Sequence, residues 1–527
     1  MTRNFILFSF VGLSLVSFAQ KSETEGPENL NWYLKDPKAD GVYGTGATKA
    51  YEMLNAAGKK STTVIVAVID SGVETDHPDL KDVIWVNEDE IPNNGIDDDK
   101  NGYIDDVNGW SFLGGPTEDI DQEALELARM YRTESAYFKG KKAEDIPTSE
   151  LARFATYEKI KMAFEKEIEE KQSSLRNIRM LSDYMQRVEQ QAGTSFSKET
   201  NAAYVPTTET DKRIQNRMKQ ILDMLPAEQL STELSGAIKS LEGAIEMSKR
   251  DADSIRTAIV GDNPNDLSSK IYGCNRYEGP DAMHGTHVSG IIAATRVNGM
   301  GIDGVADNVR IMVLRAVPDG DERDKDVANA IIYAVDNGAK VINMSFGKYW
   351  TPNKDYVDAA IEYARSKDVL LVHAAGNDAK DKDVEDSYPT RRLNNKTIAP
   401  NWIEVGASSS SKSGKDILAN FSNYGATTVD FFAPGVDIYS TVPDFNYENA
   451  SGTSMACPAT AGVAALIRSY FPELSASEVR EVLMATTAPY KKTVIAPNGE
   501  KAKMKDLCIT GGFVNAANAV AYLLEKK

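Results

Sequence analysis

Cysteine is scarce in this chain of 527 residues, which contains only Cys274, Cys457 and Cys508. Three cysteines cannot form a disulfide framework, and at least one thiol stays unpaired within the monomer. Stability therefore has to come from a buried apolar core. The chain is long enough for about two to four ordinary domains, or for one large α/β domain that carries an insertion.

Basic residues and long apolar runs are also lacking. Lysine and arginine number 59 against 78 aspartates and glutamates, which gives a formal charge of −19. Such a surface repels phosphate backbones, so a nucleic-acid partner is disfavoured. A helix that spans a membrane needs about 20 apolar residues, and the only candidate run, residues 5–16, is shorter. We therefore expect no membrane span in the mature chain.

The N-terminal run has the features of an export signal. Arg3 precedes it, and Ser17-Phe18-Ala19 follows with small residues at the two positions that a signal peptidase reads. We predict that residues 1–19 are a signal peptide and that the mature protein is exported, either to a periplasm or out of the cell. An uncleaved N-terminal anchor is the alternative, but the run is too short to cross a bilayer.

Strand-like and helix-like segments alternate through most of the chain. Runs of apolar, mostly β-branched residues are typical of buried parallel strands and occur at 64–69, 309–317, 340–346, 369–374 and 402–407. Segments with helical periodicity lie between them at 324–337 and 353–367. The alternation predicts an α/β fold in which helices cover both faces of a parallel sheet.

One segment interrupts this alternation. Residues 121–260 hold only four of the 37 glycines and no tryptophan. Apolar residues recur there at helical steps, in two sets that predict two long helices: Tyr157, Ile160, Phe164, Ile168, Leu175, Ile178, Leu181, Met185 and Val188, then Leu230, Leu234, Ile238, Leu241 and Ile245. The Thr- and Asn-rich stretch 193–211 is expected to be the loop between them. We predict an inserted, coiled-coil-like α-helical hairpin over residues 119–261.

Three short motifs place reactive side chains at the ends of predicted elements. Asp70 follows the first strand, where it is either a functional carboxylate or part of an ordinary turn. His284 lies at the start of an apolar helix, and His287 follows one turn later. The two histidines are an alternative candidate for a zinc site, but no further ligand lies near them in sequence. Ser454 lies between a glycine-containing turn and a helix, a position that suits a helix N-cap or a nucleophile.

Taken together, the motifs supply an acid, a base and a nucleophile in the chain order Asp, His, Ser. The sequence resembles the subtilisin-like (S8) serine peptidases in four motifs: Val-Ile-Asp-Ser-Gly at 68–72, His-Gly-Thr-His-Val at 284–288, Ala-Ala-Gly-Asn at 374–377 and Gly-Thr-Ser-Met-Ala at 452–456. The resemblance implies a subtilisin-like peptidase domain made of residues 61–118 and 262–527, preceded by an N-terminal extension at 20–60.

The resemblance implies a secreted serine endopeptidase that hydrolyses polypeptides without a catalytic cofactor. Ser454 would be the nucleophile, His284 its general base, and Asp70 the carboxylate that orients the imidazole. The side-chain amide of Asn377 would stabilise the oxyanion. His287 is interpreted as a structural histidine, and His77 and His373 as histidines with satisfied packing.

The same resemblance implies where substrate lies. Ser345, Phe346 and Gly347 match the edge segment against which family substrates are added as a β-strand. Ala374, Ala375 and Gly376 would form the opposite wall. Two other functions stay open: an exopeptidase variant, because an insertion can block one end of a cleft, and a non-catalytic peptide-binding scaffold. In either case the helical hairpin could bind a protein partner.

An acidic loop at residues 93–106 is a candidate cation site. Asp97, Asp99, Asn101 and Asp105 alternate along it, and Gly102 occupies the expected sharp turn of a calcium loop. The twelfth position holds Asn108 where that pattern requires glutamate. A structural calcium ion and a solvated acidic loop therefore remain as two interpretations.

Overall fold

A computed structural model describes residues 30–223 and 225–526. The predicted signal peptide lies outside these residues. The chain divides into two compact units, one made of Met1–Glu123 and Asp253–Lys527, and the other of Ala124–Ala252. Within the described residues, no helix combines the length and the apolar character that crossing a membrane requires.

The first unit is built on a nine-stranded sheet formed by the described residues, in the order β10-β13-β7-β6-β5-β4-β1-β3-β2. All neighbouring strands are parallel except β10 and β13. The strands are β1 (Val64–Asp70), β2 (Gly109–Ser111), β3 (Val309–Arg315), β4 (Val341–Met344), β5 (Leu370–Ala374), β6 (Trp402–Ser408), β7 (Phe431–Pro434), β10 (Ala488–Pro489) and β13 (Gly512–Phe513).

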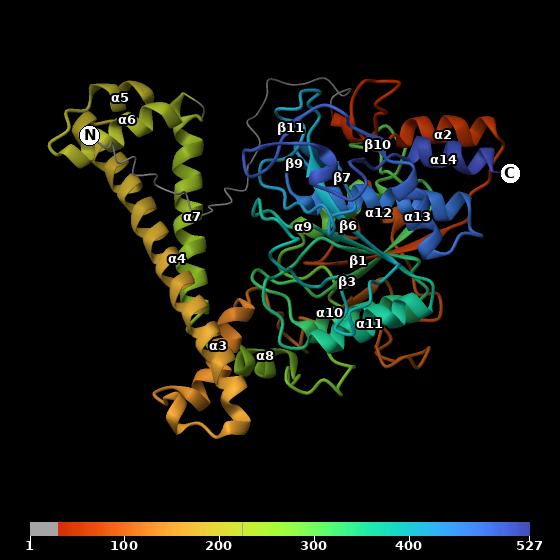
Figure 1. Ribbon diagram of the computed structural model, residues 1–527, viewed down its shortest axis with the longest axis horizontal. Coiled ribbons are helices and arrows are strands. Elements are labelled where there is room, and N and C mark those ends of the chain that lie inside the picture. The colour runs from red at the N-terminus through yellow and green to blue at the C-terminus, as the bar shows by residue number, and fades with distance from the viewer. Residues whose placement is uncertain (1–29, 224, 527) are drawn as a thin grey trace. The chain divides into compact units, whose positions relative to one another are not determined.

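Helices cover both faces of this sheet, as the sequence predicts (Figure 1). One apolar core joins the sheet to α2 (Ala47–Ala56), α9 (Met283–Ala293), α12 (Thr453–Tyr470), α13 (Ala476–Ala485) and α14 (Ala516–Glu525). A second core on the opposite face joins it to α10 (Asp324–Asp336) and α11 (Lys354–Ser366). The observed α/β architecture confirms the predicted fold class.

The second unit is wholly helical. Its two longest helices are α4 (Leu151–Ala192) and α7 (Ala227–Met247), which pack along one another (Figure 1). A shorter helix, α3 (Glu126–Phe138), packs against α4 through a cluster of aromatic rings. The two apolar stripes of the sequence therefore form the two arms of a hairpin.

The expected loop at 193–211 is wrong, because it contains α5 (Lys198–Ala203) and the start of α6 (Glu209–Leu222). Two of the polar side chains that make this stretch look like a loop, Ser197 and Thr208, are helix N-caps. The Ser197 side chain accepts a hydrogen bond from the Thr200 N–H, and the Thr208 side chain accepts one from the Asp211 N–H. Buried residues of α4, α6 and α7 then form one cluster at this end of the hairpin.

Candidate active site

Asp70 and His284 meet at the carboxyl end of β1. Asp70 is the last residue of that strand, and His284 lies in the first turn of α9. The His284 Nδ1–H donates to Asp70 Oδ1 at 2.7 Å, and the Ser71 N–H donates to the same oxygen at 2.8 Å. Gly285 permits this approach, since a Cβ there would lie 2.1 Å from the Gly72 carbonyl oxygen.

Two opposing effects set the pKa of His284. Burial is the largest single effect, and it lowers the pKa of His284. The charge and hydrogen bond of Asp70 raise the pKa, as does the charge of Asp281. Together these outweigh burial, so the pKa lies above its usual value. The Asp70 side chain is only 2% exposed, whereas that of His284 is 39% exposed. The imidazole is therefore held by a buried carboxylate and remains accessible to a reactant.

Ser454 is the second residue of α12, the helix that packs against β4, β5 and β6. N–H groups in a first helical turn lack intrahelical partners, and the helix dipole there favours negative charge. The Ser454 hydroxyl donates to the Ser345 carbonyl oxygen at 3.1 Å, and the Ser345 hydroxyl donates to the Ser454 carbonyl oxygen at 2.9 Å. Within the described residues, the hydroxyl therefore bonds to Ser345 and not to His284.

Asn377 lies beside this helix start. Its Oδ1 accepts hydrogen bonds from the Thr453 N–H at 2.8 Å and from the Thr453 hydroxyl at 2.9 Å. These two bonds fix the amide so that its Nδ2 remains a donor. A Cβ built on Gly452 would lie 3.7 Å from both Asn377 Nδ2 and Ser454 Cβ. The missing side chain of Gly452 therefore keeps the space between the amide and the serine open.

Two segments border the start of α12, and both follow sheet strands. Residues 345–347 follow β4 and contact Ser454 as described, while residues 374–376 end and follow β5. The Gly376 N–H donates to the Thr453 hydroxyl at 3.1 Å. Since β1, β4 and β5 are neighbours in the parallel sheet, their carboxyl ends bring Asp70, Ser345 and Ala374 to one edge.

The acidic loop does not gather the four predicted residues at one point. Asp97 accepts hydrogen bonds from the Asn101 and Gly102 N–H groups, and Asp105 from those of Asn94 and Gly95. Asp97 and Asp105 therefore stabilise turns of the loop.

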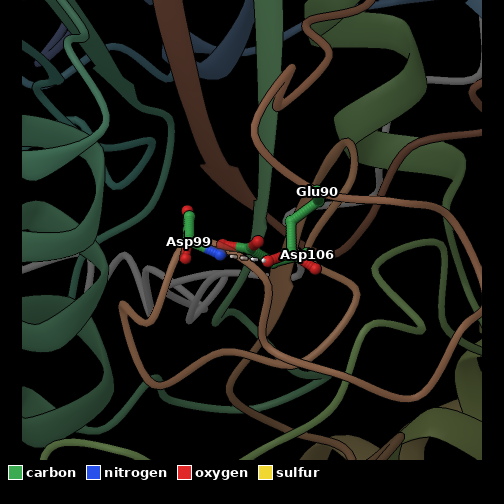
Figure 2. Close-up of side chains that lie close together, drawn as sticks. All are labelled: Glu90, Asp99 and Asp106. Atoms are coloured by element: carbon green, nitrogen blue, oxygen red, sulfur yellow. Dashed lines mark hydrogen bonds between the residues drawn. The ribbon is translucent and has the colours of Figure 1, made fainter.

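A different set of carboxylates converges there: oxygens of Glu90, Asp99 and Asp106 lie within 4.8 Å of one another (Figure 2). The Asn101 side-chain amide donates to both Asp99 and Asp106, at 2.9 and 3.0 Å. Burial raises the pKa of Asp106 to about 6, although hydrogen bonds from Tyr333, Asn101 and Asn87 act in the opposite direction and lower the pKa. Glu90 precedes the loop and Asp106 falls outside its alternation, so the sequence pattern did not single them out.

Two of the remaining histidines are structural. The ring of His77 bonds to the Asn446 carbonyl oxygen and to the Asp79 N–H. His287 Nε2 lies 3.0 and 3.1 Å from the carbonyl oxygens of Ile438 and Glu448, and burial lowers the pKa of this histidine to about 4. A neutral ring that is held by two carbonyl groups is not available as a base at Ser454.

Comparisons with known proteins identify the family of the chain. The model of the subtilase family matches residues 61–508, so the chain belongs to that family of serine peptidases. Thermitase from Thermoactinomyces vulgaris is 36% identical over 239 residues, which are 44% of this chain and 78% of thermitase. The resemblance inferred from the four motifs is therefore confirmed.

Two further matches each cover less than half of this chain. The thermophilic serine proteinase of Bacillus sp. (strain AK1) is 45% identical over 35% of this chain, and the match spans 42% of that protein, less than half its length. A solved structure described as proteases from Pseudoalteromonas arctica PAMC 21717 has 31% identity and a TM-score of 0.38, and the match covers 45% of this chain and 70% of that one.

Proposed function

We propose that this chain is an exported serine endopeptidase that hydrolyses polypeptides with Ser454, His284 and Asp70. The 2.7 Å hydrogen bond between His284 Nδ1 and Asp70 at the sheet edge that also holds Ser454 is the observation that carries the proposal. The predicted signal at residues 1–19 supports export. Reaction of Ser454 with a fluorophosphonate tests the function directly.

The proposed mechanism follows from the orientation of the imidazole. Because the Nδ1–H donates a hydrogen bond to Asp70, the lone pair is on Nε2. Nε2 then takes the proton of the Ser454 hydroxyl as the serine oxygen attacks the substrate carbonyl. The Asp70 charge then stabilises the imidazolium. Nε2 returns the proton to the leaving amine, and a water molecule repeats the sequence to release the acyl group.

Substrate backbone would lie along residues 345–347. Within the described residues, the N–H and C=O groups of Phe346 and Gly347 make no backbone hydrogen bond, whereas Lys348 pairs with Tyr388. Unpaired backbone groups beside Ser454 suit an added β-strand, which recognises the backbone of an extended polypeptide. We therefore expect proteins and peptides to be the substrates.

Asn377→Ala should lower kcat by about a hundredfold or more, since removal of one oxyanion donor has this order of effect. KM should change little, because the amide gains its partner only when the carbonyl oxygen becomes charged. Steady-state kinetics on a chromogenic peptide measure both values. The matched control is Asn395→Ala, on an exposed loop, which should behave as wild type. Asn423→Ala would be unsuitable, because the Asn423 side-chain amide donates a hydrogen bond to the Ala375 carbonyl oxygen in the wall segment.

We also propose that the acidic loop binds a structural calcium ion through carboxylate oxygens. If so, saturating calcium should raise the melting temperature by about 5 °C and a chelator should reverse the gain, because the ion binds the folded loop better than the unfolded chain. The double variant Asp99→Asn, Asp106→Asn, which neutralises two of the three converging carboxylates, should lose this response. Asp183→Ala, an exposed aspartate of α4, is the control and should keep it. An unchanged calcium response in the double variant would exclude the loop.

The inserted unit is proposed to act on the choice of substrate and not on the chemistry. Replacing residues 125–251 with a short Gly/Ser linker should preserve hydrolysis of a small peptide ester and change activity on folded proteins. Ala124 and Ala252 belong to one buried cluster, so a short linker can join the remaining ends. Parallel assays with the ester and with a folded protein measure the ratio of the two activities. If this ratio is the same with and without the insertion, the insertion is only a spacer.

A longer deletion provides the contrast. Arg256 is fully buried in the first unit and donates to Asp326 at 2.6 Å and to Asp262 at 3.3 Å. Replacing residues 122–259 would therefore leave the buried Asp326 carboxylate without its arginine, at a cost of about 3–5 kcal/mol, whereas Asp262 keeps its ion pair with Lys325. We expect this longer deletion to lower the melting temperature and both activities, unlike the shorter one.

A further inference from the structure

A cavity of about 320 Å³ adjoins the segment that leads into the proposed catalytic base. One of its walls is formed by residues 278–283, which end directly before His284. The other wall belongs to a hairpin made of β8 (Ile438–Val442) and β9 (Asn446–Ala450). Pockets that take up ligands begin at about 300 Å³, so this space can hold a side chain of a bound polypeptide.

Hydrogen bonds hold the hairpin wall against α9, the helix that carries His284. The Ser440 hydroxyl donates to the His287 carbonyl oxygen at 2.7 Å, and the His287 ring bonds to the Glu448 carbonyl oxygen. At the hairpin turn, the Asp444 N–H donates to the buried carboxylate of Glu74 at 2.8 Å. The cavity is therefore a fixed feature beside the start of α9.

The charged side chains that line the cavity are all acidic. They are Glu278 and Asp281 on the first wall, and Asp444 and Glu448 on the second. No lysine, arginine or histidine of the described residues lines the cavity, so its walls contain no charge that neutralises these carboxylates. Arg315 lies behind Gly279, but it is buried and forms an ion pair with Asp119.

These negative charges act on one another and on the proposed base. Burial raises the pKa of Glu278, and the charges of Glu74 and Asp76 raise it further. Burial lowers the pKa of His284, whereas the Asp281 charge is among those that raise it, which places one wall of the cavity within reach of the imidazole. A cation in the cavity would relieve the repulsion, and an anion would add to it.

We propose that this cavity receives a lysine or arginine side chain from the part of the substrate that follows the scissile bond. The inference deepens the proposed function and rests on it. His284 Nε2 returns its proton to the leaving amine, so the leaving segment begins beside His284 and passes the wall formed by residues 278–283. Glu278, Asp444 and Glu448 then determine specificity, because they attract a cationic side chain and repel an acidic one.

The test compares three peptides that differ only in the two residues after the scissile bond, which are both lysine, both glutamine or both glutamate. At low ionic strength, we expect kcat/KM for lysine to exceed that for glutamine by about fivefold and that for glutamate by about thirtyfold. Salt at about 1 M should remove most of this preference, because the carboxylates are exposed and become screened. Mass spectrometry of the products verifies that the same bond is cut in each peptide.

Glu278→Gln combined with Asp444→Asn removes one charge from each wall and preserves the size of both side chains. This double variant should reduce the lysine-to-glutamate ratio by about fivefold or more. Asp281 is left unchanged because its charge also acts on the proposed base. The matched control is Asp416→Asn with Glu481→Gln, which changes the net charge equally at exposed positions outside the cavity and should keep the wild-type ratio.

The outcomes separate the two proposals, with rates expressed per active site titrated with a fluorophosphonate. Equal wild-type rates on the lysine and glutamate peptides at low ionic strength would overturn the assignment of the cavity, and so would a preference that the Glu278→Gln, Asp444→Asn variant retains. A response of this variant confined to peptides whose charged residues precede the scissile bond would overturn it as well. Failure to cleave any peptide, together with no fluorophosphonate reaction, would instead contradict the proposed peptidase function.

Discussion

Ser454→Ala is expected to lower casein hydrolysis by about a millionfold, to the background level. The variant removes the oxygen proposed to attack the substrate, whereas the Asn377 amide and the wall segments remain. Ser454 bonds to Ser345 through its hydroxyl and lies at a helix start where alanine is tolerated, so the melting temperature should change little. Turnover by purified variant and wild type, with circular dichroism as the check on folding, measures the effect.

Ser451→Ala is a suitable control for this experiment. Ser451 precedes the same helix and its hydroxyl accepts a hydrogen bond from the Asp437 N–H, but it is not part of the proposed triad. It should retain activity within a small factor of wild type. Casein turnover by Ser454→Ala at the wild-type rate would contradict the assignment of the nucleophile.

Asp70→Asn is expected to lower kcat/KM by about ten thousandfold. The asparagine keeps the size of the side chain but loses the charge that stabilises the imidazolium, and it no longer enforces a proton on His284 Nδ1. Steady-state kinetics at the optimum pH of each enzyme measure the loss. A loss below about tenfold would show that Asp70 does not act on His284.

The pH profile of the same variant gives an independent readout. In wild type, kcat/KM should fall as the pH drops through the pKa of His284, which the Asp70 charge and hydrogen bond hold above its usual value. Removing that charge leaves burial as the main influence, so the residual activity of Asp70→Asn should have its inflection at lower pH. An inflection at the same pH in both proteins would contradict the pairing of Asp70 with His284.

The sheet and its central helices could be predicted from the sequence because they are governed by local apolar patterns. The run at 64–69 becomes β1 with one further residue, Asp70, and the segment at 324–337 becomes α10. The short strands β10 and β13, at one end of the sheet, could not be found in this way. Each contains two residues, and their pairing depends on long-range contacts that no local pattern encodes.

The residues proposed for catalysis could be located in the sequence for a different reason. Motifs around Asp70, His284 and Ser454 are short and specific, and each lies at the end of an element where the fold fixes its direction. The acidic loop was harder, because carboxylates at alternate positions can bind a cation or cap turns with equal ease, and Asp97 binds backbone N–H groups. His373 was interpreted as satisfied, since a sequence cannot show that one of its ring nitrogens has no partner.

The most direct measurement is covalent labelling with a fluorophosphonate followed by mass spectrometry of the digested protein. The proposed mechanism predicts one adduct per chain, located on Ser454, absent from Ser454→Ala and formed far more slowly in Asp70→Asn. Active, folded protein that gains no adduct, or gains it on another residue, would contradict the account of Ser454 as a nucleophile activated by His284 and Asp70.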